Sequence, residues 1–239
     1  MSISLIDKRI KKIRIKDKGN GFIATEQIPK NTIILSEYPS FKIEKYKQNP
    51  SEIFEMIYII LKSDNKDFKS NFLKYMPHSL DNNNFHEYKK KIKHELKNLD
   101  KINPQISKYL KSHYSENDLI LYSLKYICNA FDFFDEGPII LLNGSIFNHS
   151  CSPNIIFGKL SDKMVFITIR DINKNEELCN SYINIYQDTK KRQKILQNQY
   201  GFICKCERCN TNVDLKSQNI KKQINEIKLL NKNMQFNKV

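Results

Sequence analysis

Residues 200–209 read Tyr-Gly-Phe-Ile-Cys-Lys-Cys-Glu-Arg-Cys, and they place three thiols, Cys204, Cys206 and Cys209, within six positions. Thiols packed so closely cannot readily pair as disulfides among themselves, but their thiolates can converge on one tetrahedral ion. The spacing therefore predicts a zinc site, with a set of reduced surface thiols as the alternative. A closed structural site needs a fourth ligand from elsewhere in the chain. The candidates for that ligand are Cys151, Cys128, Cys179 and His149.

Cys151 lies in residues 148–154, Asn-His-Ser-Cys-Ser-Pro-Asn, a turn-rich stretch that can present a side chain from a loop. If it were the fourth ligand, the metal would clamp two parts of the chain that are far apart in sequence. The basic N-terminus lacks an apolar stretch followed by small residues, so we expect no secretory signal. In a reducing compartment, clustered cysteines indicate metal ligands before disulfides.

The composition is that of a globular chain with a basic excess. The 239 residues carry a formal charge of +14, and 40% of them are hydrophobic. No apolar run is long enough to span a bilayer, so we expect neither a membrane protein nor a secreted disulfide scaffold. Residues 186–239 hold twelve lysines and arginines against four acids, a net charge of +8. This segment predicts either a surface for nucleic acid or a composition bias, and we favour the bias because aromatic residues do not alternate with the charges.

Periodicity divides the chain into strand-rich and helical parts. Two strands are predicted at residues 21–28 and 32–37, separated by a turn at Pro29, and a hairpin at 154–160 and 163–170 turns around Ser161. Residues 171–177 are predicted to form a further turn, in which Asn173 or Asn175 can take a positive φ.

The middle of the chain is predicted to be helical. Apolar residues from Ile53 to Leu61 recur at helical spacing, and Ser115 or Asn117 can cap a later helix. A helix is also predicted at 188–199, with Gly201 just after its last turn. The last thirty residues show only a weak helical pattern.

Four motifs, taken in this order, resemble the SET-domain protein lysine methyltransferases, and more narrowly the SET-and-MYND (SMYD) branch. The motifs are Gly19-Asn20-Gly21-Phe22, Asn148-His149-Ser150-Cys151-x-Pro-Asn154, Glu177-Leu-x-x-Ser181-Tyr182 and Tyr200-Gly-Phe202-x-Cys204-x-Cys206-x-x-Cys209. The resemblance runs from about Arg14 to Cys209. It departs from the family near Pro39, where the cysteine and histidine ligands of a MYND finger are missing.

This resemblance implies an α+β fold of the SET-domain (β-clip) type, built from short β-sheets. The SET domain would cover residues 1–185 and be split by a helical insert at about 42–125. A zinc-binding post-SET segment would follow at 186–212, and a basic, partly helical or disordered tail at 213–239. By resemblance, Cys151 completes the zinc site with Cys204, Cys206 and Cys209, so His149 is rated lower as a ligand.

The resemblance also implies the catalytic site. Tyr182 corresponds to the active-site tyrosine, whose hydroxyl lies near the transferred methyl group and orients the amine. Aromatic walls would exclude water and tolerate a methylammonium product, and a low dielectric lowers the pKa of the lysine substrate. The walls of this lysine channel would be Phe131, Tyr182, Tyr200 and Phe202. The alternative for any one of these rings is an ordinary place in the core.

For the methyl donor, S-adenosylmethionine, the glycines Gly19 and Gly21 allow close backbone approach, and Lys18 and Asn20 would meet its methionine end. By resemblance, Asn148 lies near the amino group of the donor and the backbone of His149 near its adenine. Asn129 is a further polar contact. Tyr182 and Phe202 complete the cofactor-binding residues.

The predicted function is therefore N-methylation of lysine side chains in a protein, histone or not, with S-adenosylmethionine as methyl donor and a structural Zn²⁺. The alternatives are a SET-type binding module that has lost catalysis and a zinc-stabilised, basic nucleic-acid-binding protein. We expect an intracellular protein of the nucleus or cytoplasm with no membrane partner. The basic surface also allows contact with nucleic acid.

Overall fold

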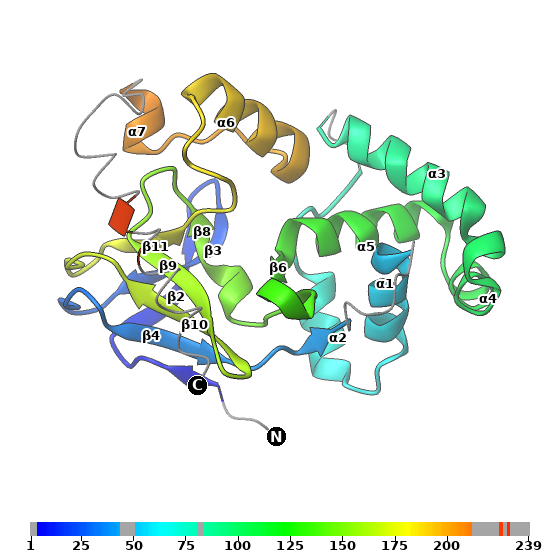
Figure 1. Cartoon of the computed structure of the whole chain (residues 1–239), viewed down its shortest axis with the longest axis horizontal. Helices are drawn as coiled ribbons and strands as arrows, with labels where there is room; N and C mark the ends of the chain where they lie inside the picture. The colour runs from blue at the N-terminus through cyan, green and yellow to red at the C-terminus, as the bar shows by residue number, and fades with distance from the viewer. Residues whose placement is uncertain (1–3, 44–50, 81–83, 212–224, 227–228, 230–239) are drawn as a thin grey trace. The chain divides into compact units, whose positions relative to one another are not determined.

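A computed structural model describes residues 4–43, 51–80 and 84–211, together with 225, 226 and 229 (Figure 1). The chain forms two compact units. The sheet unit comprises residues 1–39, 143–194 and 203–239, and the helical unit comprises 40–142 and 195–202. Among the described residues, none of the helices combines the length and the apolar character that crossing a bilayer requires.

The first sheet of the sheet unit has the strand order β1-β4-β10-β9 and is antiparallel throughout. Its strands are β1 (Leu5–Ile6), β4 (Ile33–Glu37), β9 (Ile155–Leu160) and β10 (Lys163–Thr168). The predicted hairpin is present as β9 and β10, and Ser161 in its turn takes a φ of +56°. Asn175 takes a φ of +66°, as one of the two alternatives predicted.

The second sheet has the order β2-β3-β11-β8. Its strands are β2 (Ile10–Ile15), β3 (Gly19–Ala24), β8 (Asn148–His149) and β11 (Glu177–Asn180). β8 and β11 run parallel, with Asn148 opposite Cys179 and His149 opposite Asn180. This pairing brings the motif at 148–154 beside the motif at 177–182, although about thirty residues separate them in sequence.

Three aromatic rings link the two sheets. Phe22 on β3 lies 4.9 Å from Phe147, measured between ring centroids, and Phe147 lies 4.8 Å from Phe166 on β10. All three side chains are buried. Because Phe147 directly precedes β8, the same packing that closes the core fixes the start of the motif at 148–154.

The helical unit contains five complete α-helices among the described residues. They are α1 (Glu52–Lys62), α2 (Lys66–Leu73), α3 (His86–Ile102), α4 (Pro104–His113) and α5 (Glu116–Asn129). The predicted pattern at 53–61 is buried on α1, and Ser115 caps α5 in a capping box with Asp118. A small sheet of order β5-β7-β6 completes the unit, with β5 (Phe41–Lys42), β6 (Ala130–Asp132) and β7 (Pro138–Ile140).

The helix predicted at 188–199 is observed as α6 (Thr189–Ile195), which continues into a π-helical turn at Leu196–Tyr200. Gly201 ends it with a φ of +77°, and an added Cβ would lie 2.7 Å from the ring of Phe85. A further short helix, α7, spans Glu207–Asn210. The tail predicted at 213–239 lies almost entirely outside the described residues.

Candidate active site and metal site

The sulfur atoms of Cys151, Cys204, Cys206 and Cys209 all lie within 4.8 Å of one another. The Sγ atoms of Cys151 and Cys209 are 3.5 Å apart. Zn–S bonds of about 2.3 Å in a tetrahedron place ligand sulfurs about 3.8 Å apart, so this spacing fits a zinc ion with four thiolates. Four thiolates also leave no open position for water, as in a structural rather than a catalytic site.

Backbone and side-chain contacts hold the cysteine segment in place. The side chain of Gln193, on α6, both accepts from the backbone N–H of Cys204 at 2.8 Å and donates to its carbonyl at 2.7 Å. Cys206 is the N-cap residue of α7, and the N–H of Cys209 donates to the Cys206 carbonyl at 3.0 Å. The loop between the three cysteines is therefore ordered by α6 as well as by any bound metal.

The two remaining cysteine candidates lie outside this cluster. Cys179 is buried in β11, and burial raises its pKa to about 12. Burial likewise raises the pKa of Cys128 to about 12, and its thiol donates to the Gln199 carbonyl at 3.2 Å. Both behave as protonated, apolar side chains, whereas a metal ligand is a thiolate.

Both ring nitrogens of the buried side chain of His149 are engaged. Nδ1 accepts a hydrogen bond from the backbone N–H of Tyr182 at 3.0 Å, and Nε2 lies 3.3 Å from the Sγ of Cys151. Burial lowers the His149 pKa to about 3, so the ring is neutral. Since Nδ1 accepts, Nε2 carries the proton and donates to the sulfur. This geometry disfavours His149 as the fourth ligand and makes it a bridge from Cys151 to Tyr182.

Tyr182 is held at both ends. Its backbone N–H donates to His149, and its hydroxyl donates to the carbonyl of Phe147 at 2.8 Å. The rings of Tyr182 and His149 lie 5.3 Å apart between centroids. The phenol is therefore fixed beside β8, and its oxygen keeps acceptor capacity because only its proton is used in this bond.

A polar cluster surrounds the glycine motif. The side-chain amide of Asn148 donates to the Asn20 carbonyl at 3.1 Å and to Glu177 at 2.9 Å, and Lys18 donates to the other oxygen of Glu177 at 2.5 Å. Burial opposes the charged form of Lys18, but the bond to Glu177 and the nearby acidic groups together outweigh burial, and the pKa of Lys18 is raised. A Cβ added to Gly21 would lie 2.6 Å from the Asn148 amide nitrogen. Glycine at this position of β3 therefore permits the close approach of the amide.

Comparisons with known proteins identify the family. The family model described as SET domain matches residues 19–183, more than half of the chain. The chain belongs to the SET domain family. It is 41% identical over 204 residues to the SET domain-containing protein L678 of Acanthamoeba polyphaga mimivirus, covering 85% of this chain and 78% of that protein.

Two further likenesses are more distant. The N-lysine methyltransferase SMYD2-B of Danio rerio is 32% identical over 106 residues, which cover 42% of this chain and 24% of that protein. The SET domain of LSMT, solved with lysine and AdoHcy, superposes with a TM-score of 0.62 at 16% identity, over 84% of this chain and 54% of that chain. These likenesses support the SET fold, and the chain spans only about a quarter of the SMYD2-B length.

Within the SET domain, two buried polar residues carry no signal in the sequence. Glu37, 2% exposed at the end of β4, accepts from the backbone N–H groups of Asn143 and Gly144 at 2.9–3.1 Å. The fully buried Asn180 ends β11, and its amide nitrogen and oxygen have no hydrogen-bond partner among the described residues. A buried amide of this kind is costly, which identifies a polar position next to Ser181 and Tyr182. No spacing rule marks either residue, because the partners of Glu37 lie in a turn about a hundred residues away and burial of Asn180 depends on the folded core.

The remaining predicted residues lie in the helical unit of the SET domain. Asn129 ends α5, and its amide donates to the carbonyls of Lys125 at 2.7 Å and Met76 at 3.0 Å. The rings of Tyr200 and Phe202 lie 6.5 Å apart, and burial raises the Tyr200 pKa. Phe131 lies in β6. Their roles in a lysine channel and in cofactor binding stay predictions.

Proposed function

We propose that this SET domain transfers a methyl group from S-adenosylmethionine to the side-chain amine of a lysine in a protein. The observation that carries the proposal is the fixed Tyr182, bonded to His149 through its N–H and to the Phe147 carbonyl through its hydroxyl. Family membership supports the same chemistry.

S-adenosylmethionine supplies an electrophilic methyl carbon; as the amine N–C bond forms, the S–C bond breaks, and the amine proton leaves to water. The chain itself need supply no nucleophile, so its task is positioning. The Tyr182 oxygen can accept a hydrogen bond from the amine and aim its lone pair. A low-dielectric channel would favour an uncharged amine, which alone can attack.

The polar cluster around Gly21 suits the methionine end of the donor. Lys18 offers an ammonium for a carboxylate, and Glu177 and the Asn148 carbonyl oxygen offer acceptors for an amino group. The close packing of Asn148 over Gly21 forms a cradle that any larger residue would fill. We propose that Lys18, Gly19, Asn20, Gly21, Asn148 and His149 form the donor site.

We propose that Cys151, Cys204, Cys206 and Cys209 hold one Zn²⁺. The fit of the four sulfurs to a tetrahedron supports this. The metal would supply folding energy rather than reactivity, because it would join the segment at 204–209 to Cys151. Through His149, the same site would stiffen the backbone at Tyr182.

We also propose the walls of the lysine channel and further contacts to the donor. Phe131, Tyr200 and Phe202 would complete the channel with Tyr182, and Asn129 and Phe202 would add contacts to the donor. The substrate would be a protein lysine, on a histone or another protein, in the nucleus or cytoplasm. Contact with nucleic acid would use exposed cations, of which Lys11, Lys12 and Arg14 lie on β2.

The test is methyl transfer by the purified zinc-loaded protein, using labelled S-adenosylmethionine and a cell extract, with modified residues mapped by mass spectrometry. Tyr182→Phe should lower turnover about 100-fold through loss of alignment while the affinity for the donor stays within a few-fold. Tyr38→Phe, a matched half-buried tyrosine in the sheet unit, should leave turnover unchanged.

Three results would contradict the proposal. Equal turnover in wild type and Tyr182→Phe would remove the role of the phenol. Donor binding with no transfer to any lysine would favour a SET-type binding module. Strongly salt-dependent DNA binding with no affinity for S-adenosylmethionine would favour the nucleic-acid-binding alternative.

A further inference from the structure

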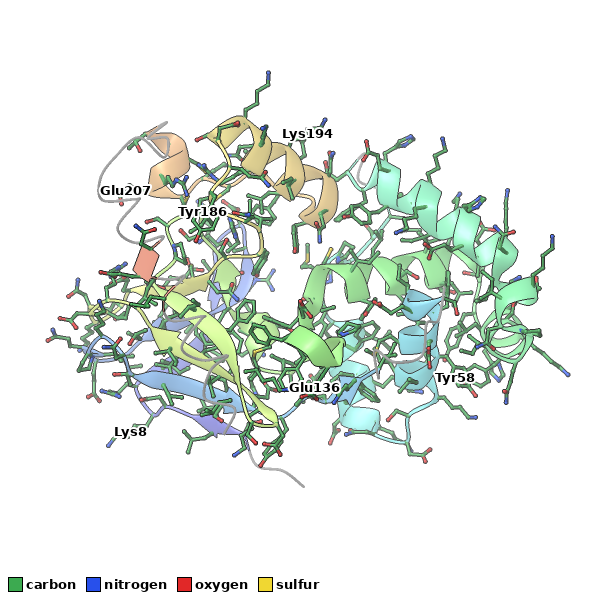
Figure 2. The ribbon with its side chains drawn as sticks, in the orientation of Figure 1. Lys8, Tyr58, Glu136, Tyr186, Lys194 and Glu207 are labelled. Carbon is green, nitrogen blue, oxygen red and sulfur yellow. The ribbon has the colours of Figure 1, made fainter. Side chains whose placement is uncertain are left out.

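Two arginines lie buried beside the cysteine cluster. Arg192 on α6 is fully buried, and Arg208 on α7 is 3% exposed. The same two helices also carry exposed charged side chains, among them Lys194 on α6 and Glu207 on α7, which Figure 2 labels. Burial of a guanidinium is rare unless a partner compensates its charge.

The hydrogen bonds of both arginines lead back to the cysteine cluster. Arg192 donates from Nη2 to the sulfur of Cys209 at 3.8 Å. Arg208 donates from Nη1 to the backbone carbonyl of Cys151 at 3.1 Å. The remaining bonds of both groups go to neutral oxygens, which are the Gln187 carbonyl, the Thr189 hydroxyl and the Ile185 carbonyl.

Neither guanidinium has a carboxylate within salt-bridge distance in the part of the chain that the structure describes. Three of their buried nitrogens, Nε of Arg192 and Nε and Nη2 of Arg208, also have no hydrogen-bond partner there. Two positive charges are thus removed from water without a carboxylate to offset them. Such an arrangement is strongly unfavourable unless other negative charges lie close by.

Among the described residues, the acidic groups beside these guanidinium groups are the cysteine thiols: Arg192 is bonded to the Cys209 sulfur and Arg208 to the Cys151 carbonyl. Four thiolates around one Zn²⁺ carry four negative charges against two positive ones, a net charge of −2. The two arginines carry +2, so the buried assembly is neutral. We propose that Arg192 and Arg208 are the counter-charges of this zinc–thiolate site and that they set its affinity for zinc.

This inference rests on the zinc site of the proposed function but not on methyl transfer. It differs from a purely structural role, in which the guanidinium groups would serve only as hydrogen-bond donors to nearby carbonyls. A structural role requires a donor of similar reach, whereas a counter-charge requires a positive charge. Lysine keeps the charge and loses the planar fork, and glutamine keeps an amide donor and loses the charge.

The experiment compares Arg192→Lys with Arg192→Gln, and Arg208→Lys with Arg208→Gln, in the full chain. Zinc affinity is measured by competition with a chromogenic chelator, and thiolate ligation by the charge-transfer band of the cobalt-substituted protein. We expect both glutamine variants to bind zinc about 10- to 100-fold more weakly, as second-shell changes do, and both lysine variants to lie nearer to wild type. Lys194→Gln, an exposed cation on α6, should leave the affinity unchanged.

Equal affinities for the glutamine and lysine variants at both positions would overturn the proposal, whatever their effect on thermal stability. If one glutamine variant does not fold, the lysine variant at the same position is compared with the glutamine variant at the other arginine. A lower zinc affinity for the lysine variant would overturn the proposal too. A wild-type protein that binds no zinc would instead remove the metal site itself. Methyl transfer is not a readout here, so its absence would bear only on the proposed function.

Discussion

His149 joins the cysteine cluster to Tyr182 through two different ring atoms. Nε2 faces the sulfur of Cys151, and Nδ1 accepts from the N–H of Tyr182. By the family resemblance, the backbone of His149 contacts the donor, so its side chain can form the bridge. The two bonds can be broken separately, because asparagine reproduces the position of Nδ1 and glutamine that of Nε2.

We therefore expect His149→Asn to retain the bond to Tyr182 but to bind zinc about 10-fold more weakly. His149→Gln should retain zinc and lose turnover. Zinc affinity by chelator competition and turnover with a methylatable protein measure the two effects independently. If both variants lost zinc affinity and turnover in the same proportion, the two bonds would not be separate functions.

Lys125 is a further buried cation and lies on α5 in the helical unit, 3% exposed. Its ammonium donates to the carbonyls of Tyr75 and Pro77. Burial lowers its pKa from 10.5 to about 8. Between these two values the unfolded chain binds more protons at this site than the folded chain, so stability contributed here rises with pH and is least below pH 8.

The free energy of unfolding of wild type minus that of Lys125→Met should thus increase by about 3 kcal/mol from pH 8 to 10.5. Urea unfolding at a series of pH values measures this difference, and groups shared by both proteins cancel. The exposed Lys97→Met on α3 should show no such trend. Parallel curves for wild type and Lys125→Met would show that the ammonium stays charged through this range.

Among individual residues, the sequence predicts those whose role depends on their spacing along the chain. Three cysteines in six residues imply a metal because ligand number and geometry are fixed by the ion. No such spacing identifies Glu37, Arg192 or Arg208, since nothing in the sequence distinguishes a buried charge from a solvated one. Arg192 and Arg208 belong to the basic segment at 186–239, yet both are buried beside the cysteine cluster.

Elements were predicted better than their pairing. Both strands expected at 21–28 and 32–37 are present, yet β3 and β4 belong to different sheets. Local composition favours a strand but does not choose its partner, which depends on long-range packing. The parallel pair of β8 and β11 was beyond sequence pattern altogether, because β8 has only two residues. The resemblance nevertheless identified both of its motifs.

Glu37 connects β4 to the segment that leads into β8. Its carboxylate accepts from two successive backbone N–H groups of the turn at Asn143 and Gly144, which precedes Phe147. Charge-assisted bonds of this kind are stronger than neutral ones, and an amide can replace only part of them. The turn at Asn143 and Gly144 is therefore held by the side chain of Glu37, which lies on β4.

Glu37→Gln should lower the free energy of unfolding by about 1–3 kcal/mol in urea unfolding. Hydrogen exchange at the Gly144 amide should accelerate more than exchange in β9, since the lost bond is local. Glu26→Gln, an exposed glutamate, should change stability by less than about 0.5 kcal/mol. Unchanged exchange at Gly144 would mean that the turn holds its shape without the carboxylate.

Over the whole molecule, each unit has its own core. The helical unit buries one continuous apolar cluster that runs from Ile43 to Ile140. The sheet unit contains the cysteine cluster and the packed rings of Phe22, Phe147 and Phe166. Because the proposed metal links only segments of the sheet unit, its removal should not act on the chain uniformly.

Zinc removal by a chelator, or Cys206→Ser, should therefore loosen the sheet unit selectively. Three thiolates hold zinc less firmly than four, and without the metal the buried charges of Arg192 and Arg208 lose their compensation. Hydrogen exchange should rise strongly at residues 203–211 and 189–194 and remain slow in α1, α3 and α5, and methyl transfer should be lost. Cys128→Ser, outside the cluster, should retain zinc and the exchange pattern of the sheet unit. Full activity in the zinc-free protein would contradict this account, since the metal would then be dispensable. An equal loss of protection from hydrogen exchange in all helices would contradict it as well, since the metal would then be required by the chain as a whole.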